Sequence, residues 1–258
     1  MADSTDYLTV AEKAARRGGD VLAEWAGRFT VSEKSPANLV TEADHASQEA
    51  IFDCIREHFP EHGFLGEEGL SRIGDDPRWR WVIDPLDGTS NYVHGFPYYA
   101  VSIALERDGE LFAGTIFDPN RDEIFSAIQG GGVTLNGEQI RPSRAEKLSE
   151  ALVMASLPIA AGPDDPAVQR LLRIMTHAQH VQRTGSAALN LAYVATGRID
   201  AFWSTSLKPW DVAAGALLVT EAGGRVTCID GSPAQIEVPD ILASNGSGIH
   251  QELIELLP

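Results

Sequence analysis

The stretch Trp81-Val82-Ile83-Asp84-Pro85-Leu86-Asp87-Gly88-Thr89 joins a short apolar run to a turn that carries two aspartates. The apolar run predicts a β-strand that stops at Asp84, because proline restricts the residue before it and cannot donate to a strand ladder. A turn stiffened by Pro85 can direct both carboxylates the same way, and oxygen-only ligands suit hard cations such as Mg²⁺. Gly88 and Thr89 add N–H groups and a hydroxyl, as a phosphate group requires. Asp, Pro and Gly are also common in turns that bind nothing, so this pattern alone favours an ordinary turn.

Two helices are expected before this stretch. Apolar residues recur at helical spacing over residues 4–26, and Thr41-Glu42-Ala43-Asp44 has the pattern of a capping box that opens a second helix, stopped by Pro60. Between the helices we expect a polar loop at Ser32–Pro36. After them, Phe64–Gly69 is predicted to be a short strand that runs into a loop.

Strands and helices are arranged differently in the two halves of the chain. β-rich runs at residues 98–105, 111–117 and 123–128, separated by turn signals, predict an antiparallel meander. Beyond the polar stretch Arg141–Glu150, strands alternate with helices, which are expected at 166–178, 186–196 and 212–222. We therefore expect residues 1–145 to form an α+β half with metal-binding motifs, and residues 146–258 to form an α/β half that completes the site.

The composition of the 258 residues excludes several kinds of partner. With 20 basic and 37 acidic residues the formal charge is -17, which repels nucleic acid and anionic membrane surfaces. Two cysteines cannot build a disulfide framework. The N-terminus has no signal-peptide pattern, and no apolar run approaches the roughly 18 residues of a membrane span. We expect a soluble, cytoplasmic protein, and an acidic enzyme could still bind a small anion if divalent cations lay between its carboxylates and that anion.

Several further motifs accompany the Asp84–Asp87 turn at other positions in the chain. Gly66-Glu67-Glu68 precedes it, Ser90–Pro97 continues it, and Trp210–Gly215 and Thr220–Gly224 follow. Together with Leu39–Asp44, these motifs resemble the inositol monophosphatase family, and the similarity extends from about Val10 to the C-terminus. The resemblance implies a layered αβαβα sandwich of the inositol monophosphatase and fructose-1,6-bisphosphatase type. It also implies a lithium-sensitive, homodimeric phosphatase that hydrolyses a small phosphate monoester with Mg²⁺-activated water.

The resemblance also implies roles for individual residues. One Mg²⁺ would be bound by Glu67, Asp84 and the carbonyl of Leu86, a second by Asp84, Asp87 and Asp211, and a third, weaker ion by Glu67. Catalytic roles would fall on Glu67, Thr89 and Asp44, with Thr89 and Asp44 orienting the attacking water. Substrate contacts are expected from Asp87, Gly88, Thr89, Gly185, Ser186, Ala187 and Asp211.

Simpler interpretations exist for several of these residues. Asp44 could serve only as the third helical residue of a capping box, and Asp211 could only stabilise a helix N-terminus through its charge. Glu68 is expected to be a solvated surface acid, and His94 shows no sign of a ligand role. Lys34 could reach the site from its loop or remain a solvated charge.

The substrate and the reaction class leave alternatives. Ser204 stands where family members that process inositol usually carry a glutamate. The sequence therefore supports membership of the family more strongly than it supports inositol monophosphate as the substrate. Histidinol phosphate, fructose 1,6-bisphosphate and phosphoadenosine phosphate are substrates of relatives with the same fold. A haloacid-dehalogenase type of phosphatase is disfavoured because Pro85 stands where its nucleophile should be. A catalytically silent regulator that binds metal or phosphate is the non-enzymatic alternative.

Overall fold

The apolar run of residues 81–83 forms the middle of strand β5 (Trp79–Asp87) in an eight-stranded sheet. The computed structural model describes residues 4–35 and 38–257. Trp81 and Ile83 pack into one hydrophobic cluster, whereas Val82 packs into another. Successive side chains of a strand point to opposite faces, so both faces of this sheet are covered, and this explains the uninterrupted apolar run.

The eight-stranded sheet is built largely from an antiparallel meander, as predicted. β5 to β8 pair in chain order, and β3 runs parallel to β5. At the predicted turn Asp108-Gly109 both residues have positive φ, 55° and 82°, as a two-residue hairpin turn requires. In spatial order the strands are β10 (Glu138–Gln139), β9 (Gly132–Leu135), β8 (Glu123–Ile128), β7 (Glu110–Asp118), β6 (Ala100–Arg107), β5, β3 (Gly63–Gly66) and β4 (Ser71–Arg72).

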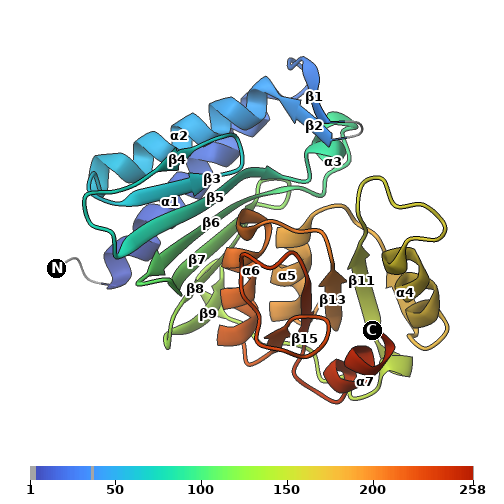
Figure 1. The fold of residues 1–258 in the computed structure, drawn as a ribbon. Helices are drawn as coiled ribbons and strands as arrows, with labels where there is room; N and C mark the ends of the chain where they lie inside the picture. The colour runs from blue at the N-terminus through green and yellow to red at the C-terminus, as the bar shows by residue number, and fades with distance from the viewer. Residues whose placement is uncertain (1–3, 36–37, 258) are drawn as a thin grey trace.

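Helices α1 (Ser4–Trp25) and α2 (Glu42–His58) cover one face of this sheet (Figure 1). The predicted capping box of α2 is confirmed, because the Asp44 carboxylate accepts the backbone N–H of Thr41 at 2.8 Å. The loop expected at Ser32–Pro36 is wrong where the structure describes it. There β1 (Val31–Ser35) pairs antiparallel with β2 (Asn38–Thr41). The polar side chains of Ser32 and Glu33 are exposed and suggested a loop, whereas the two strands are held together by backbone pairing.

A five-stranded sheet forms the other half of the molecule. Its strands in spatial order are β12 (His180–Gln182), β11 (Leu152–Ser156), β13 (Ala201–Ser204), β15 (Ile241–Ser244) and β14 (Arg225–Thr227). β12 was not predicted, because three residues are too few to show a period of two. Helices α5 (Ala187–Ala195) and α6 (Pro209–Glu221) pack between the two sheets, and α4 (Pro166–Met175) and α7 (Ile249–Leu256) pack on the outer face.

The elements therefore stack as α1 and α2, the eight-stranded sheet, α5 and α6, the five-stranded sheet, then α4 and α7 (Figure 1). This confirms the αβαβα sandwich. A five-residue helix, α3 (Thr89–Val93), follows β5 directly. The N-termini of α5 and α6 come close to the end of β5, where the predicted site residues lie.

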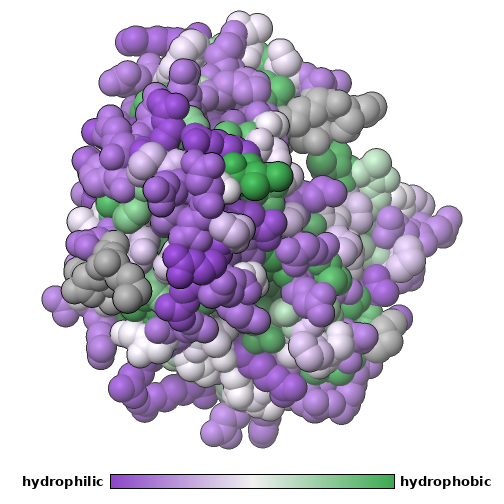
Figure 2. Space-filling model, turned by 60° about the vertical axis from the view of Figure 1, so that its left-hand side comes forward, coloured by the Kyte–Doolittle hydropathy of each residue, from purple (hydrophilic) through white to green (hydrophobic). Residues whose placement is uncertain are grey.

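Hydrophilic side chains dominate the face of the molecule drawn in Figure 2, and hydrophobic ones appear there as small separate patches. Among the described residues, no helix combines the length and the apolar character that a membrane crossing needs.

His62 is a buried histidine in an aromatic cluster beneath α1. Its ring stacks on those of Phe59 and Trp79, with centroids 4.9 and 5.4 Å away, and Trp81 Nε1 donates a hydrogen bond to His62 Nδ1 at 3.0 Å. A protonated Nδ1 could not accept that hydrogen bond. Burial lowers the pKa of His62 to about 4.

His62 should destabilise the folded protein as the pH falls from about 6.5 to about 4, because His62 of the unfolded chain then binds a proton that His62 of the folded chain does not. Replacing His62 with glutamine, which can still accept from Trp81, should raise the unfolding free energy at pH 5.0, relative to that at pH 7.5, by about 1–2 kcal/mol. Urea titrations at pH 7.5 and pH 5.0 measure this difference in unfolding free energy. The exposed control His45→Gln should keep the wild-type difference, and an unchanged difference in His62→Gln would refute the assignment.

Candidate active site

A β-bulge in β5 positions the two aspartates of the central stretch. Asp84 pairs with Ser102 and Asp87 with Ala100, so two residues of β5 lie opposite one residue of β6. The prediction that the strand stops at Asp84 is therefore wrong. Pro85 sits inside the bulge, where the ladder needs no N–H, and the strand continues beyond it. On α2, Ser47 donates a hydrogen bond to the Pro85 carbonyl at 3.0 Å and fixes the bulge against the helix layer.

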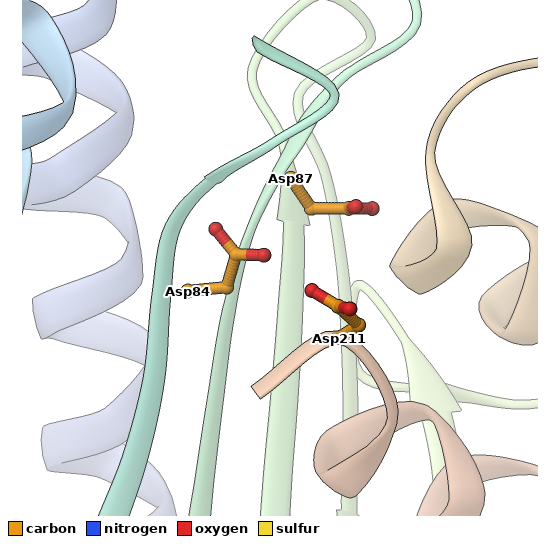
Figure 3. Close-up of side chains that lie close together, drawn as sticks. All are labelled: Asp84, Asp87 and Asp211. Carbon is orange, nitrogen blue, oxygen red and sulfur yellow. The ribbon is translucent and has the colours of Figure 1, made fainter. Parts of the chain in front are cut away.

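Asp84, Asp87 and Asp211 converge at one point between the two sheets. Each offers a carboxylate oxygen, and the three oxygens lie within 4.8 Å of one another. Figure 3 shows the carboxylates pointing toward one another, two from β5 and one from the first turn of α6. The structure thus brings together three of the predicted metal ligands from opposite ends of the sequence.

Asp211 serves its helix and the cluster at the same time. It is the third residue of α6, and its Oδ2 accepts the backbone N–H of Lys208 at 2.7 Å. The simpler interpretation, stabilisation of a helix N-terminus, is therefore correct but incomplete, because the same carboxylate faces Asp84 and Asp87.

Asp87 is held by the N-terminus of α5. It accepts hydrogen bonds from the Ser186 hydroxyl, from the N–H of Ala188 at 2.8 Å and from the N–H of Ala187 at 3.3 Å. Ser186 and Ala187 were predicted to contact substrate, and in this structure they orient Asp87. Free N–H groups at a helix N-terminus favour a carboxylate, so α5 fixes the direction of Asp87.

Two glycines of the predicted site have backbone conformations that favour glycine. Gly88, with φ of 97°, precedes α3, and Gly185, with φ of 88°, precedes the cap of α5. A Cβ on Gly185 would lie 3.0 Å from the side chain of Asn91. Asn91 Nδ2 donates to the carbonyls of Thr184 and Tyr98. No sequence pattern indicated a role for Asn91, although it links segments on both sides of the site.

Thr89 and Asp44 form the predicted pair. Thr89 Oγ1 lies 3.1 Å from Asp44 Oδ1 and 3.2 Å from the carbonyl oxygen of Leu86. The other oxygen of Asp44 accepts the hydroxyl and the N–H of Thr41 at 2.6 and 2.8 Å. Asp44 is completely buried, so it caps α2 and contacts Thr89 with no contribution from solvent.

Glu67 and Leu86 lie beside the cluster. Glu67 follows β3 and donates its backbone N–H to the carbonyl of Ile83 at 3.2 Å. Burial is the main cause of the raised pKa values of Asp84 and Asp44, and the charge of Glu67 raises both further. The N–H of Leu86 donates to Asp84 Oδ1 at 3.0 Å. Glu67 does not belong to the group of three converging carboxylates. The side chain of Lys34, on β1, is outside the described part of the chain.

Burial makes ionisation of the cluster costly. It raises the pKa of Asp84 well above its usual range, with repulsion from Glu67 as the next cause, and raises that of Asp87 to about 6. Burial and repulsion from Asp87 raise the pKa of Asp211 to about 8. Within residues 4–35 and 38–257, no Lys, Arg or His forms an ion pair with these three aspartates. A divalent cation would supply the missing positive charge, and an all-oxygen donor set fits a hard metal ion.

Ser204, the position that departs from the inositol pattern, is fully buried at the end of β13. Its hydroxyl has no hydrogen-bond partner among the described residues. Ser204 therefore provides no charged acceptor for a polyol.

Comparison with known proteins places the chain among phosphatases. The model of the inositol monophosphatase family matches residues 3–258. An inositol-1-monophosphatase of Mesorhizobium japonicum is 40% identical over 242 residues, which cover 92% of this chain and 91% of the relative. A protein of Salmonella typhimurium named Nus factor SuhB is also 40% identical, with the same coverage.

Solved structures agree with this relationship. The extragenic suppressor protein SuhB of Bartonella henselae superimposes with a TM-score of 0.94 at 38% identity, covering 98% of both chains. A staphylococcal inositol monophosphatase, SaIMPase-II, has a TM-score of 0.80 at 28% identity and covers 96% of this chain and 91% of its own. It has been solved with inositol monophosphate and, separately, with 2′-AMP. Our chain, a phosphoric monoester hydrolase, belongs to the inositol monophosphatase family.

Proposed function

We propose that the protein hydrolyses inositol monophosphate, or a small phosphate monoester of similar size, with two or three Mg²⁺ ions held by its acidic cluster. The observation that carries the proposal is the convergence of carboxylate oxygens of Asp84, Asp87 and Asp211 within 4.8 Å, with the first two side chains buried, the third half-buried, and no ion pair to a cationic side chain among the described residues. When bound, divalent cations supply positive charge and Lewis acidity toward the phosphoryl group. Glu67 and the Leu86 carbonyl would complete the set of oxygen ligands.

Thr89 and Asp44 are suited to hold the attacking water. A hydroxyl has one proton, and Thr89 directs it to an acceptor, either Asp44 Oδ1 at 3.1 Å or the Leu86 carbonyl at 3.2 Å. The lone pairs of Thr89 Oγ1 are then free to accept a hydrogen bond from water and to orient its oxygen. Asp44 receives two further hydrogen bonds from Thr41, which prevent it from turning away.

The identity of the substrate rests on the relatives. SaIMPase-II has been solved with both inositol monophosphate and 2′-AMP, so a related site accepts alcohols of different shape on the phosphate. The relatives that are 40% identical carry two different names, inositol-1-monophosphatase and Nus factor SuhB. Inositol monophosphate is therefore our first candidate, although Ser204 offers no carboxylate to its ring hydroxyls.

Three further properties follow from the family and are proposed with the function: a homodimer, a cytoplasmic location and inhibition by lithium. The division into halves at residues 1–145 and 146–258 is also proposed, with β5 and α6 contributing ligands from opposite sides.

Asp87→Asn should abolish phosphate release and the rise in melting temperature that Mg²⁺ produces in the wild type. The reason is that an amide provides one neutral oxygen where the cluster needs a charged one. A phosphate-release assay and thermal unfolding with Mg²⁺ or with a chelator measure both. The exposed control Asp75→Asn should behave like the wild type. Full activity in Asp87→Asn, or in chelator, would exclude the scheme.

Thr89→Val should lower kcat strongly while it leaves the Mg²⁺-induced rise in melting temperature in place, because the hydroxyl would be lost and the carboxylates kept. Thr89→Ser should restore most of the turnover. If Thr89→Val abolished the thermal shift as well, Thr89 would act in holding the metal and not the water.

Comparison of kcat/KM values for inositol 1-phosphate, histidinol phosphate, fructose 1,6-bisphosphate, phosphoadenosine phosphate and 2′-AMP at one Mg²⁺ concentration tests the substrate. We expect inositol 1-phosphate to be the best of these. A better value for any other ester would replace it as substrate and leave the hydrolytic chemistry unchanged.

A further inference from the structure

A cavity of about 730 Å³ lies between α6, the β6–β7 hairpin and the segment 233–241, and none of the three site aspartates lines it. This volume falls in the range of about 300–1,000 Å³ that is typical of pockets for small organic ligands. The segment 233–241 is anchored at its end, because the N–H of Leu207 donates to the carbonyl of Pro239 at 2.9 Å. The cavity is therefore separate from the phosphatase site.

The charged residues that line this cavity are all acidic. No Lys, Arg or His is among its lining residues, and the acids are Glu106, Glu110, Glu221, Glu237 and Asp240. Three of the five already have partners. Arg80 forms ion pairs with Glu106 and Glu237, and the two oxygens of Glu221 accept the N–H groups of Gly130 and Gly132 at 2.9 Å.

Glu110 and Asp240 keep negative charges that no cationic side chain among the described residues neutralises, although the Cys228 thiol interacts with the Asp240 carboxylate. Neither forms an ion pair with any residue in 4–35 or 38–257. Asp240 Oδ1 is buried and has no hydrogen-bond partner among those residues. A buried carboxylate oxygen without a donor is costly, so a ligand N–H that reached it would relieve that cost.

Apolar side chains line the same cavity, among them Leu111, Val212, Leu217, Val226, Ile236 and Ile241. A hydrated metal ion gains nothing from such walls, and an anion would be repelled by the acids. A ligand that satisfies both features carries a cationic N–H group on a hydrocarbon body.

We propose that this cavity binds an organic ammonium ion with an apolar body, whose ammonium group donates to Asp240 in the field of Glu110 while its hydrocarbon part packs against α6. The site is independent of the phosphate-hydrolysing function.

Isothermal titration with hexylammonium chloride tests the proposal, in 0.15 M NaCl and saturating MgCl₂ so that exposed charges are screened and the phosphatase site is occupied. Hexylammonium should bind saturably. Hexan-1-ol, hexanoate and methylammonium should each bind at least about tenfold more weakly, because each lacks the positive charge or the apolar body. Equal affinity for hexan-1-ol or for methylammonium would overturn the proposal.

Variants distinguish binding of hexylammonium in the cavity from non-specific electrostatic attraction to the acidic surface of the protein. The double variant Asp240→Asn/Glu110→Gln should weaken hexylammonium binding by about tenfold or more, because hydrogen bonds to charged groups are among the stronger ones. The control Asp20→Asn/Glu49→Gln makes the same chemical changes at exposed positions of α1 and α2, across the sheet from α6 (Figure 1). It should bind as the wild type does. If the first variant fails to fold, Glu110→Gln alone, at an exposed side chain, should still weaken binding severalfold. Equal affinity in the variant and in the control would refute the site.

Discussion

Asp84, Asp87 and Asp211 repel one another across a few ångströms, at a point where the first two are buried and the third is half-buried. Left alone, such side chains would take up protons or swing apart, and the raised pKa values express that tendency. The surrounding structure must therefore force them together so that cations, when present, find ligands already in place. The bulge, the caps and the glycines around the site all meet this requirement.

Backbone N–H groups hold most of these carboxylates in position. Asp87 takes two from the start of α5, Asp84 takes one from Leu86, and Asp211 takes one from Lys208. Backbone donors are fixed by the fold and carry no net charge, so they aim a carboxylate without neutralising it. A lysine or arginine in the same position would have satisfied the acids and left a cation little to gain.

The sequence predicted the elements whose signals are local, and it missed those that depend on pairing. The capping box at Thr41, the meander and its Asp108-Gly109 turn could be identified because side-chain type decides them within a few residues. The bulge at Pro85 was misjudged, since only the partner strand reveals that β5 continues. The orienting role of Ser186 could not be foreseen for the same reason, because its acceptor Asp87 lies 99 positions away in the chain. The order of the motifs along the chain identified the site residues, whereas the distances between those residues came only from the tertiary structure.

Asp44 and Asp211 are each the third residue of a helix, and each accepts the N–H of the residue that precedes its helix. Selection on folding would therefore preserve both aspartates in a descendant that had ceased to turn over substrate. In the sequence of a distant homologue, the presence of Asp44 and Asp211 is therefore only weak evidence of catalytic activity. Asp84 and Asp87 begin no α-helix, so their replacement is the better sign that a lineage has abandoned the reaction.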